Sequence, residues 1–216
     1  MRSAFVEQSG VHPDLVSLIP NGVEDVFFER LSSAKPSPAG RAPRIVFAGN
    51  LAAYQGIDML LEAFALATRG RSDLRLRILS DGRFDDYQAM SDALGIRDRI
   101  DLRNASLEEL PNELAAAAVA ANPRIACDGL PQKLLNYMAA GRPIVSFVGS
   151  AKGIEDADVA LLVPDGDVTG APARCAGSAR RRRPVVAVHA GDHRKGVAAG
   201  VLDQVALEAG LHLDQT

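Results

Sequence analysis

The part of the chain that decides its fold is the segment from residue 128 to residue 145, which reads Asp128-Gly129-Leu130-Pro131-Gln132-Lys133-Leu134-Leu135-Asn136-Tyr137-Met138-Ala139-Ala140-Gly141-Arg142-Pro143-Ile144-Val145. It begins with an acid in a Gly/Pro loop and continues into an amphipathic helix in which Leu134, Leu135 and Met138 share a face. The helix pattern stops at Gly141, before a short apolar strand. The segment therefore predicts a loop–helix–strand unit.

The start of the predicted helix is suited to binding an anion. The free backbone N–H groups of residues 130–133 would point out of the helix N-terminus, where the helix dipole favours a phosphate. Asp128 would lie beside that anion, where its carboxylate can accept hydrogen bonds from sugar hydroxyls. On spacing alone, the segment is equally typical of an ordinary connection between a helix and a strand, with a solvated Asp128.

Predicted strands and helices alternate along most of the chain. Apolar strands are predicted at residues 45–48, 74–79, 100–102, 118–121, 143–147 and 159–163. Helices are predicted from about residue 56 and over residues 85–94. A third helix is expected to open with a capping box at Ser106 and Glu109 and to be interrupted by Pro111. This alternation is typical of parallel βαβ units. The sequence therefore predicts an α/β fold with a doubly wound, mostly parallel six-stranded sheet.

Four loops follow predicted strands and would meet at one edge of that sheet. They are Gly49-Asn50, Asp81-Gly82-Arg83, Asn104-Ala105-Ser106 and the loop from Asp128 to Pro131. Doubly wound sheets bind their ligands at the carboxyl ends of the strands. We therefore expect these loops to border a common crevice.

The segment from Asp128 to Asn136 resembles the signature of the family-four retaining glycosyltransferases of the GT-B fold, in which two acidic residues flank seven others. The resemblance implies that Asp128, at the catalytic position, contacts hydroxyls of the donor sugar, and that Asn136 binds the ribose of the nucleotide. It implies substrate-binding positions also for the residues between them, Gly129, Leu130, Pro131, Gln132 and Lys133. Asn136 is an amide where the family has an acid, but an amide still bonds ribose hydroxyls.

Residues 47–58 resemble the first strand, loop and helix of the GT-B donor domain, where Gly49 gives a ligand room to approach the backbone. The family usually places Arg or Lys at the positions of Asn50 and Gln55 to neutralise the diphosphate. Because amides bond phosphate more weakly than cations do, the departure implies that Lys133 or Arg83 substitutes. Taken without the family, Gly49 is more typical of a tight turn.

Two further loops take their expected roles from the resemblance. Gly82 and Arg83 are similar to the family's Gly-rich loop after the second strand, and Asn104 lies where the family's backbone cradles the nucleotide base. By residue type alone, Arg83 is more often a solvated surface side chain.

Composition narrows the classes of partner. The chain has 216 residues, 47% of them hydrophobic, and a formal charge of −3, so it lacks the basic field expected of a nucleic-acid-binding protein. Two cysteines and four scattered histidines predict neither a disulfide framework nor a metal site, and we expect no cofactor. No apolar run approaches the roughly 20 residues of a membrane span. With no signal-peptide pattern at the start, we expect a cytoplasmic protein without a transmembrane segment.

The chain divides into three parts by pattern. Residues 1–43 form a lead-in with a short strand over 16–19 and a turn at Pro20-Asn21-Gly22, which resembles the segment by which these enzymes enter their second domain. Residues 44–167 form the nucleotide-sugar-binding, Rossmann-like domain. Residues 168–216 lose all periodicity and carry 7 Lys and Arg against 4 Asp and Glu, whereas residues 1–167 carry 17 against 23. That change predicts an atypical, poorly structured tail and suggests out-of-frame translation.

We therefore predict the donor half of a GT-B glycosyltransferase, which binds a nucleoside-diphosphate sugar and meets a separately encoded acceptor-binding domain. The alternative is a non-catalytic nucleotide-sugar-binding module or a truncated remnant, which the neutral Asn50, Gln55 and Asn136 favour. A different doubly wound nucleotide enzyme, such as a sugar epimerase, fits the segment from Asp128 to Pro143 less well.

Overall fold

The computed structural model describes residues 2–17, 19, 21–34, 42–69, 71–154 and 160–169. Its centre is a six-stranded sheet in the order β3-β2-β1-β4-β5-β6, in which every pairing is parallel. The strands are β1 (Arg44–Ala48), β2 (Arg75–Leu79), β3 (Ile100–Arg103), β4 (Val119–Asn122), β5 (Ile144–Phe147) and β6 (Ala160–Val163). The chain first adds β2 and β3 in turn on one side of β1. It then crosses back and adds β4, β5 and β6 in turn on the other side of β1. The predicted doubly wound α/β fold is therefore confirmed.

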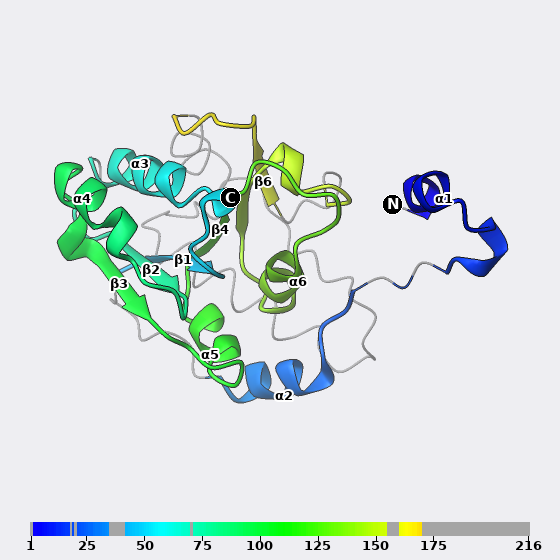
Figure 1. Ribbon diagram of the computed structural model, residues 1–216. Helices are drawn as coiled ribbons and strands as arrows, with labels where there is room; N and C mark the ends of the chain where they lie inside the picture. Colours follow the sequence, from blue (N-terminus) through cyan, green and yellow to red (C-terminus); the bar gives the residue numbers. More distant parts are fainter. Residues whose placement is uncertain are drawn as a thin grey trace, which may run out of the picture.

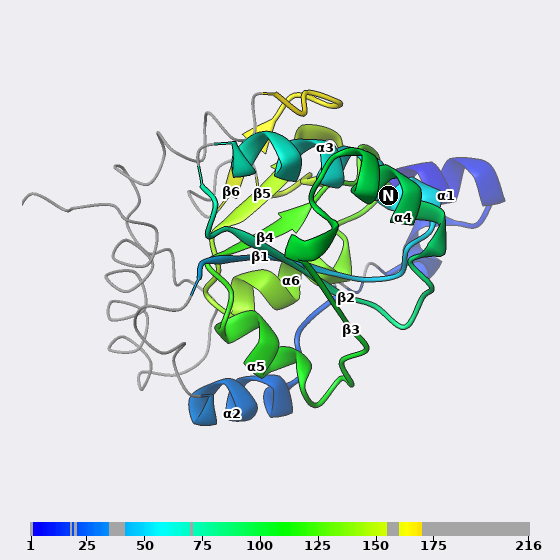
Figure 2. The ribbon, with the colours of Figure 1, turned by 90° about the vertical axis from the view of Figure 1, so that its left-hand side faces the viewer.

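Helices cover both faces of this sheet, with α3 and α4 on one side and α2, α5 and α6 on the other (Figure 2). They are α1 (Arg2–Ser9), α2 (Asp25–Ser33), α3 (Ile57–Thr68), α4 (Asp85–Ala93), α5 (Leu110–Ala115) and α6 (Gln132–Ala139), and single turns of 3₁₀ helix occur at η1 (Pro13–Leu15), η2 (Ala53–Gln55), η3 (Arg97–Arg99) and η4 (Val148–Ser150). Neighbouring residues of β1 serve different layers, since Val46 packs in the core with α6 and Phe47 in the core with α3. Strands covered on both faces account for the nearly continuous apolar runs in the sequence.

The lead-in differs from its predicted structure. Residues 16, 17 and 19 are not in a strand, and residue 18 lies outside the described residues. The unpredicted helix α2 packs Phe27 into the same core as α6, whereas α1 lies apart from the sheet (Figure 1). The proposed tail lies outside the described residues from residue 170 onward.

Pro111 was predicted to interrupt a helix, but it lies in the first turn of α5. The first turn tolerates proline because its N–H groups have no partner within the helix. The two hydrogen bonds of the predicted capping box do form, since the Ser106 N–H donates to Glu109 Oε2 at 2.9 Å and the Glu109 N–H donates to Ser106 Oγ at 3.2 Å. They lie in the turn before α5, however, and the N-cap of α5 is Glu109 rather than Ser106.

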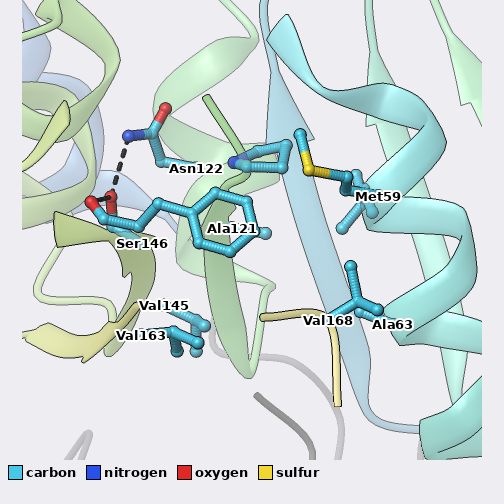
Figure 3. Close-up of a pocket in the computed structure, with 11 residues that line it drawn as sticks. Met59, Ala63, Ala121, Asn122, Val145, Ser146, Val163 and Val168 are labelled. Atoms are coloured by element: carbon cyan, nitrogen blue, oxygen red, sulfur yellow. Dashed lines mark hydrogen bonds between the residues drawn. The ribbon is translucent and has the colours of Figure 1, made fainter. Parts of the chain in front are cut away.

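The face of the sheet beside α3 is hollowed over β4, β5 and β6 into a cleft of about 50 Å³ (Figure 3). Its lining is almost entirely apolar and comes from Met59, Leu60, Ala63, Ala121, Asn122, Pro123, Val145, Ser146, Phe147, Val163 and Val168. It contains neither Asp128 nor Lys133, and its apolar surface offers little to a charged nucleotide. We therefore place the candidate site elsewhere.

Tyr137 joins α6 to the sheet. Leu134 and Tyr137 are fully buried, so Tyr137, which was not among the predicted apolar residues, shares the inner face of this helix. Its hydroxyl accepts a hydrogen bond of 2.8 Å from the Ala48 N–H and lies 3.4 Å from the Ala121 carbonyl. Burial raises the pKa of Tyr137 above its usual value, so the phenol stays neutral.

Tyr137→Phe should reduce the free energy of unfolding by about 1–3 kcal/mol, because it leaves the part-buried Ala48 N–H without its acceptor. Denaturant titration of the two proteins measures the difference. A variant as stable as the parent would show that water or a neighbouring carbonyl replaces the hydroxyl.

Candidate functional site

The first turn of α6 reaches the loop that follows β1. Lys133 Nζ donates a hydrogen bond of 2.6 Å to Gln55 Oε1 and lies 4.1 Å from the centre of the Phe47 ring. A Cβ atom at Gly49 would lie 3.0 Å from Lys133 Nζ, and the backbone φ of +149° there also favours glycine. Gly49 therefore leaves the room that the lysine head occupies.

Asn50 and Gln55 hold each other and the lysine in place. Gln55 is buried, and its Nε2 donates to Asn50 Oδ1 at 3.2 Å while its Oε1 accepts from Lys133. Asn50 Nδ2 donates in turn to the Tyr54 hydroxyl at 3.0 Å. The two amides at the family's cation positions thus form part of the support for Lys133.

Arg124, which the sequence analysis missed, lies at the other end of this group. Its guanidinium stacks 4.9 Å from the centre of the Tyr54 ring, and its Nε donates to the Ala126 carbonyl at 2.6 Å. A usable signal was in the sequence, because a basic residue three positions beyond the strand predicted at residues 118–121 lies at the ligand-binding edge of a doubly wound sheet.

The surroundings of Lys133 disfavour its charge. Burial, reinforced by the positive charge of Arg124, lowers the pKa of Lys133 to about 7. None of the ion pairs between described residues includes Lys133 or Arg124. Two cations at the ends of one group of contacting side chains, neither with a carboxylate partner among the described residues, form a place where an anion is stabilised.

Fewer backbone amides than predicted are available at the start of α6. The helix begins at Gln132, its N-cap is Pro131, and no side chain caps it. Proline has no N–H, and the Leu134 N–H already donates to the Pro131 carbonyl at 3.0 Å, so the helix amides left at this end are those of Gln132 and Lys133. Lys133 lies among them, in the first turn.

The predicted sugar- and ribose-binding residues lie in the loop before α6 and in α6 itself. Asp128 is exposed in the loop before α6, Gly129 and Leu130 are half-buried, and Asn136 lies one turn into the helix. Gln132 has a partner in the protein, since its Nε2 donates to the Gly22 carbonyl at 2.9 Å and so ties the lead-in to α6.

The structure does not bring Arg83 and Asn104 into this group. The Arg83 side chain is 90% exposed and pairs with Asp85 at 2.6 Å, just before α4, and the Gly82 N–H donates to Ser80 Oγ. Asn104 is exposed after β3. Of the two cations expected to compensate for Asn50 and Gln55, only Lys133 contacts either amide, through its hydrogen bond to Gln55.

Two negative findings concern the described part of the chain. None of its helices has the length and apolar composition needed to cross a membrane. Within the same residues, no three His, Cys, Asp or Glu side chains gather as a metal site would require.

Comparison with curated proteins gives partial matches. The exopolysaccharide phosphotransferase of Streptomyces coelicolor is 28% identical over 166 residues, which make up 75% of this chain and 17% of that protein. Alpha-D-kanosaminyltransferase of Streptomyces kanamyceticus is 29% identical over 126 residues, 56% of this chain and 32% of that protein. The chain therefore spans less than a third of the length of these relatives.

Solved structures share the fold. WaaG, a glycosyltransferase involved in lipopolysaccharide biosynthesis, superposes with a TM-score of 0.68 at 14% identity, over 97% of this chain and 56% of its own. HepE from Anabaena, solved with UDP, gives 0.66 at 16% identity with the same coverage. The C-terminal domain of the group 1 protein LpcC from Francisella tularensis gives 0.55 at 14% identity, over 72% of this chain and 83% of its own.

The family assignment rests on a match to most of the chain. The model of a family described as glycosyl transferases group 1 matches residues 42–177, which include every strand of the sheet. This protein therefore belongs to the group 1 glycosyltransferase family, and its sheet is that of a GT-B C-terminal domain.

Proposed function

We propose that this chain is the donor-binding domain of a glycosyltransferase that transfers a sugar from a nucleoside-diphosphate sugar to an acceptor hydroxyl. The observation that carries the proposal is Lys133, held by Gln55 in the first turn of α6 without a carboxylate partner among the described residues. An uncapped helix start and a cation at the carboxyl edge of a doubly wound sheet together suit a diphosphate.

Sugar transfer from a nucleoside-diphosphate sugar requires a site that stabilises the departing diphosphate. As the bond between the anomeric carbon and the diphosphate oxygen breaks, the electron pair leaves with the diphosphate, and donors aimed at it stabilise the charge that develops. Lys133 and the first amides of α6 would supply those donors. Asp128 would bind hydroxyls of the sugar, and Asn136 those of the ribose.

Two structural relatives support a nucleotide sugar as the class of ligand. HepE was solved with UDP, and the pneumococcal O-GlcNAc transferase GtfA, which superposes with a TM-score of 0.55, was solved with UDP and GlcNAc. The acceptor hydroxyl would be presented by a second domain, because the described residues contain one sheet with its helices.

A second candidate function is nucleotide-sugar binding without catalysis. Asn50 and Gln55 favour it, because they are neutral amides that make their hydrogen bonds to Tyr54, to each other and to Lys133. A diphosphate leaving group would then be less well stabilised than by cations at those two positions.

Titration calorimetry with UDP, GDP and ADP tests the shared claim of nucleotide binding. We expect weak binding of at least one of them and no sugar transfer by this chain alone, since an acceptor must be held next to the donor for transfer. An absence of heat for all three nucleotides, from protein whose circular dichroism shows it folded, would contradict both candidates.

Asp128→Ala and Asn136→Ala should separate the sugar from the nucleotide. Asp128→Ala should weaken binding of a nucleotide sugar but not of the bare nucleotide, because a carboxylate at that position meets sugar hydroxyls. Asn136→Ala should weaken both ligands by about 0.5–1.5 kcal/mol, the net value of a hydrogen bond to the shared ribose. Calorimetry of each variant with UDP and UDP-glucose measures this, and identical effects of the two substitutions would show that the roles are wrong.

A further inference from the structure

Five side chains from three segments form one continuous group with a cation at each end. The Arg124 guanidinium stacks on Tyr54, whose hydroxyl accepts from Asn50. Asn50 accepts from Gln55, and Gln55 accepts from Lys133. The loop after β1 supplies the three central members, while the loop after β4 and the first turn of α6 supply the cations.

We propose that Arg124 is the second cation of the diphosphate site, and that Tyr54, Asn50 and Gln55 set its position relative to Lys133. This inference rests on the proposed function, because it assigns a residue within the same donor site. It reverses the expected part of the two amides, which become spacers between cations rather than weak phosphate ligands.

The geometry of Arg124 fits that role. Its Nε is taken by the Ala126 carbonyl and its plane lies against Tyr54, so its orientation is fixed before any ligand arrives. No hydrogen bond between described residues uses its two terminal nitrogens, Nη1 and Nη2. A fixed guanidinium edge with free N–H groups suits the two oxygens of a phosphate.

The electrostatics favour an anion between the two cations. Lys133 is half-buried close to a like charge, which disfavours its ammonium form. A diphosphate that touches both groups would replace this repulsion with two attractions. A phosphate that touches only Lys133 would leave Arg124 without a partner among the described residues.

The test compares Arg124→Gln and Arg124→Lys with the matched control Arg97→Gln. Arg97 also lies over an aromatic ring, 5.7 Å from the centre of Phe84. Arg97→Gln therefore removes a stacked arginine outside the site. Calorimetric titration with UDP, UMP and inorganic pyrophosphate measures affinity, and thermal melting of each variant confirms that it is folded.

We expect Arg124→Gln to reduce the affinity for UDP and for pyrophosphate about tenfold or more, which is the value of a charge-assisted hydrogen bond. The loss should be smaller for UMP, whose one phosphate Lys133 can hold. Arg124→Lys should recover part of the affinity, Arg97→Gln should leave it unchanged, and the salt dependence of UDP binding should become shallower in Arg124→Gln.

The two claims fail in different ways. If UDP binds the parent and Arg124→Gln equally, the role of Arg124 is overturned while the proposed function stands. If pyrophosphate binds and depends on Arg124 but no nucleotide binds, the two-cation site stands and the nucleotide assignment fails. If neither binds the parent, both claims are overturned.

Discussion

Lys133→Met is expected to reduce the affinity of this chain for nucleoside diphosphates about ten- to a hundredfold, the value of a hydrogen bond to a charged group. Methionine keeps an unbranched stem against Phe47 but removes the ammonium that lies among the first amides of α6. Arg83→Ala is the comparison, and its effect should be smaller because Arg83 is paired with Asp85 away from this group. Titration calorimetry with UDP measures both variants. Equal affinities of the parent and Lys133→Met would contradict the compensation by Lys133.

The pH dependence of binding follows from the same side chain. In the free protein the pKa of Lys133 is about 7, and a bound diphosphate raises it because the anion favours the ammonium. Affinity should therefore fall as the pH rises above about 7, with a proton taken up on binding, and this trend should be absent in Lys133→Met. The groups that face Lys133 are the cation Arg124, the neutral Gln55 and the Phe47 ring. Calorimetry in buffers of different ionisation enthalpy measures the proton uptake.

The free protein should show the opposite trend in stability. Unfolded Lys133 has its ordinary pKa of 10.5, so between about pH 7 and 10.5 the unfolded chain binds more protons than the folded one. The contribution of this lysine to the free energy of unfolding therefore rises with pH across that window. Urea titrations of the parent and Lys133→Met at several pH values isolate this contribution as the difference between them.

Gly56→Ala should destabilise the fold by about 2–5 kcal/mol, the sum of a left-handed backbone at a non-glycine residue and an overpacked core. Gly56 has a φ of +70°, and a Cβ there would lie 2.3 Å from the Pro123 carbonyl oxygen. Since that carbonyl belongs to the backbone just before Arg124, relief of the clash must move the loop that carries Arg124. Denaturant titration measures the stability loss, and the affinity for UDP should fall with it.

Gly95→Ala is the matched control for this substitution. Gly95 has nearly the same φ, +68°, but a Cβ there would meet nothing within 4 Å. It should cost only the backbone term of about 1–2 kcal/mol. Equal losses of stability in the two variants would show that the close approach of Gly56 to Pro123 adds nothing to the cost of Gly56→Ala.

The sheet could be predicted from the sequence because its strands are short apolar runs separated by helical periodicity, which are local signals. The helix start at Lys133 was predictable for the same reason. The position of Arg124 at the ligand-binding edge was also predictable, but its role was not, because that role comes from a contact with Tyr54, 70 positions earlier, that only the fold creates. The part of Gln55 in holding Lys133 was missed likewise, since the pair is separated by 78 positions.

Errors of local prediction have local causes. Pro111 was read as a helix breaker, although proline in a first turn is compatible with a helix. Tyr137 was left out of the apolar face of α6 because its hydroxyl makes it look polar, yet the Ala48 N–H at the end of β1 satisfies that hydroxyl in the core.

The most direct measurement of the central claim is a crystal structure of this chain with UDP bound. The account predicts diphosphate oxygens within hydrogen-bond distance of Lys133 Nζ and of the first amides of α6, with Arg124 on the same anion. UDP bound elsewhere, such as in the apolar cleft over β4, β5 and β6, with Lys133 still bonded only to Gln55, would contradict it.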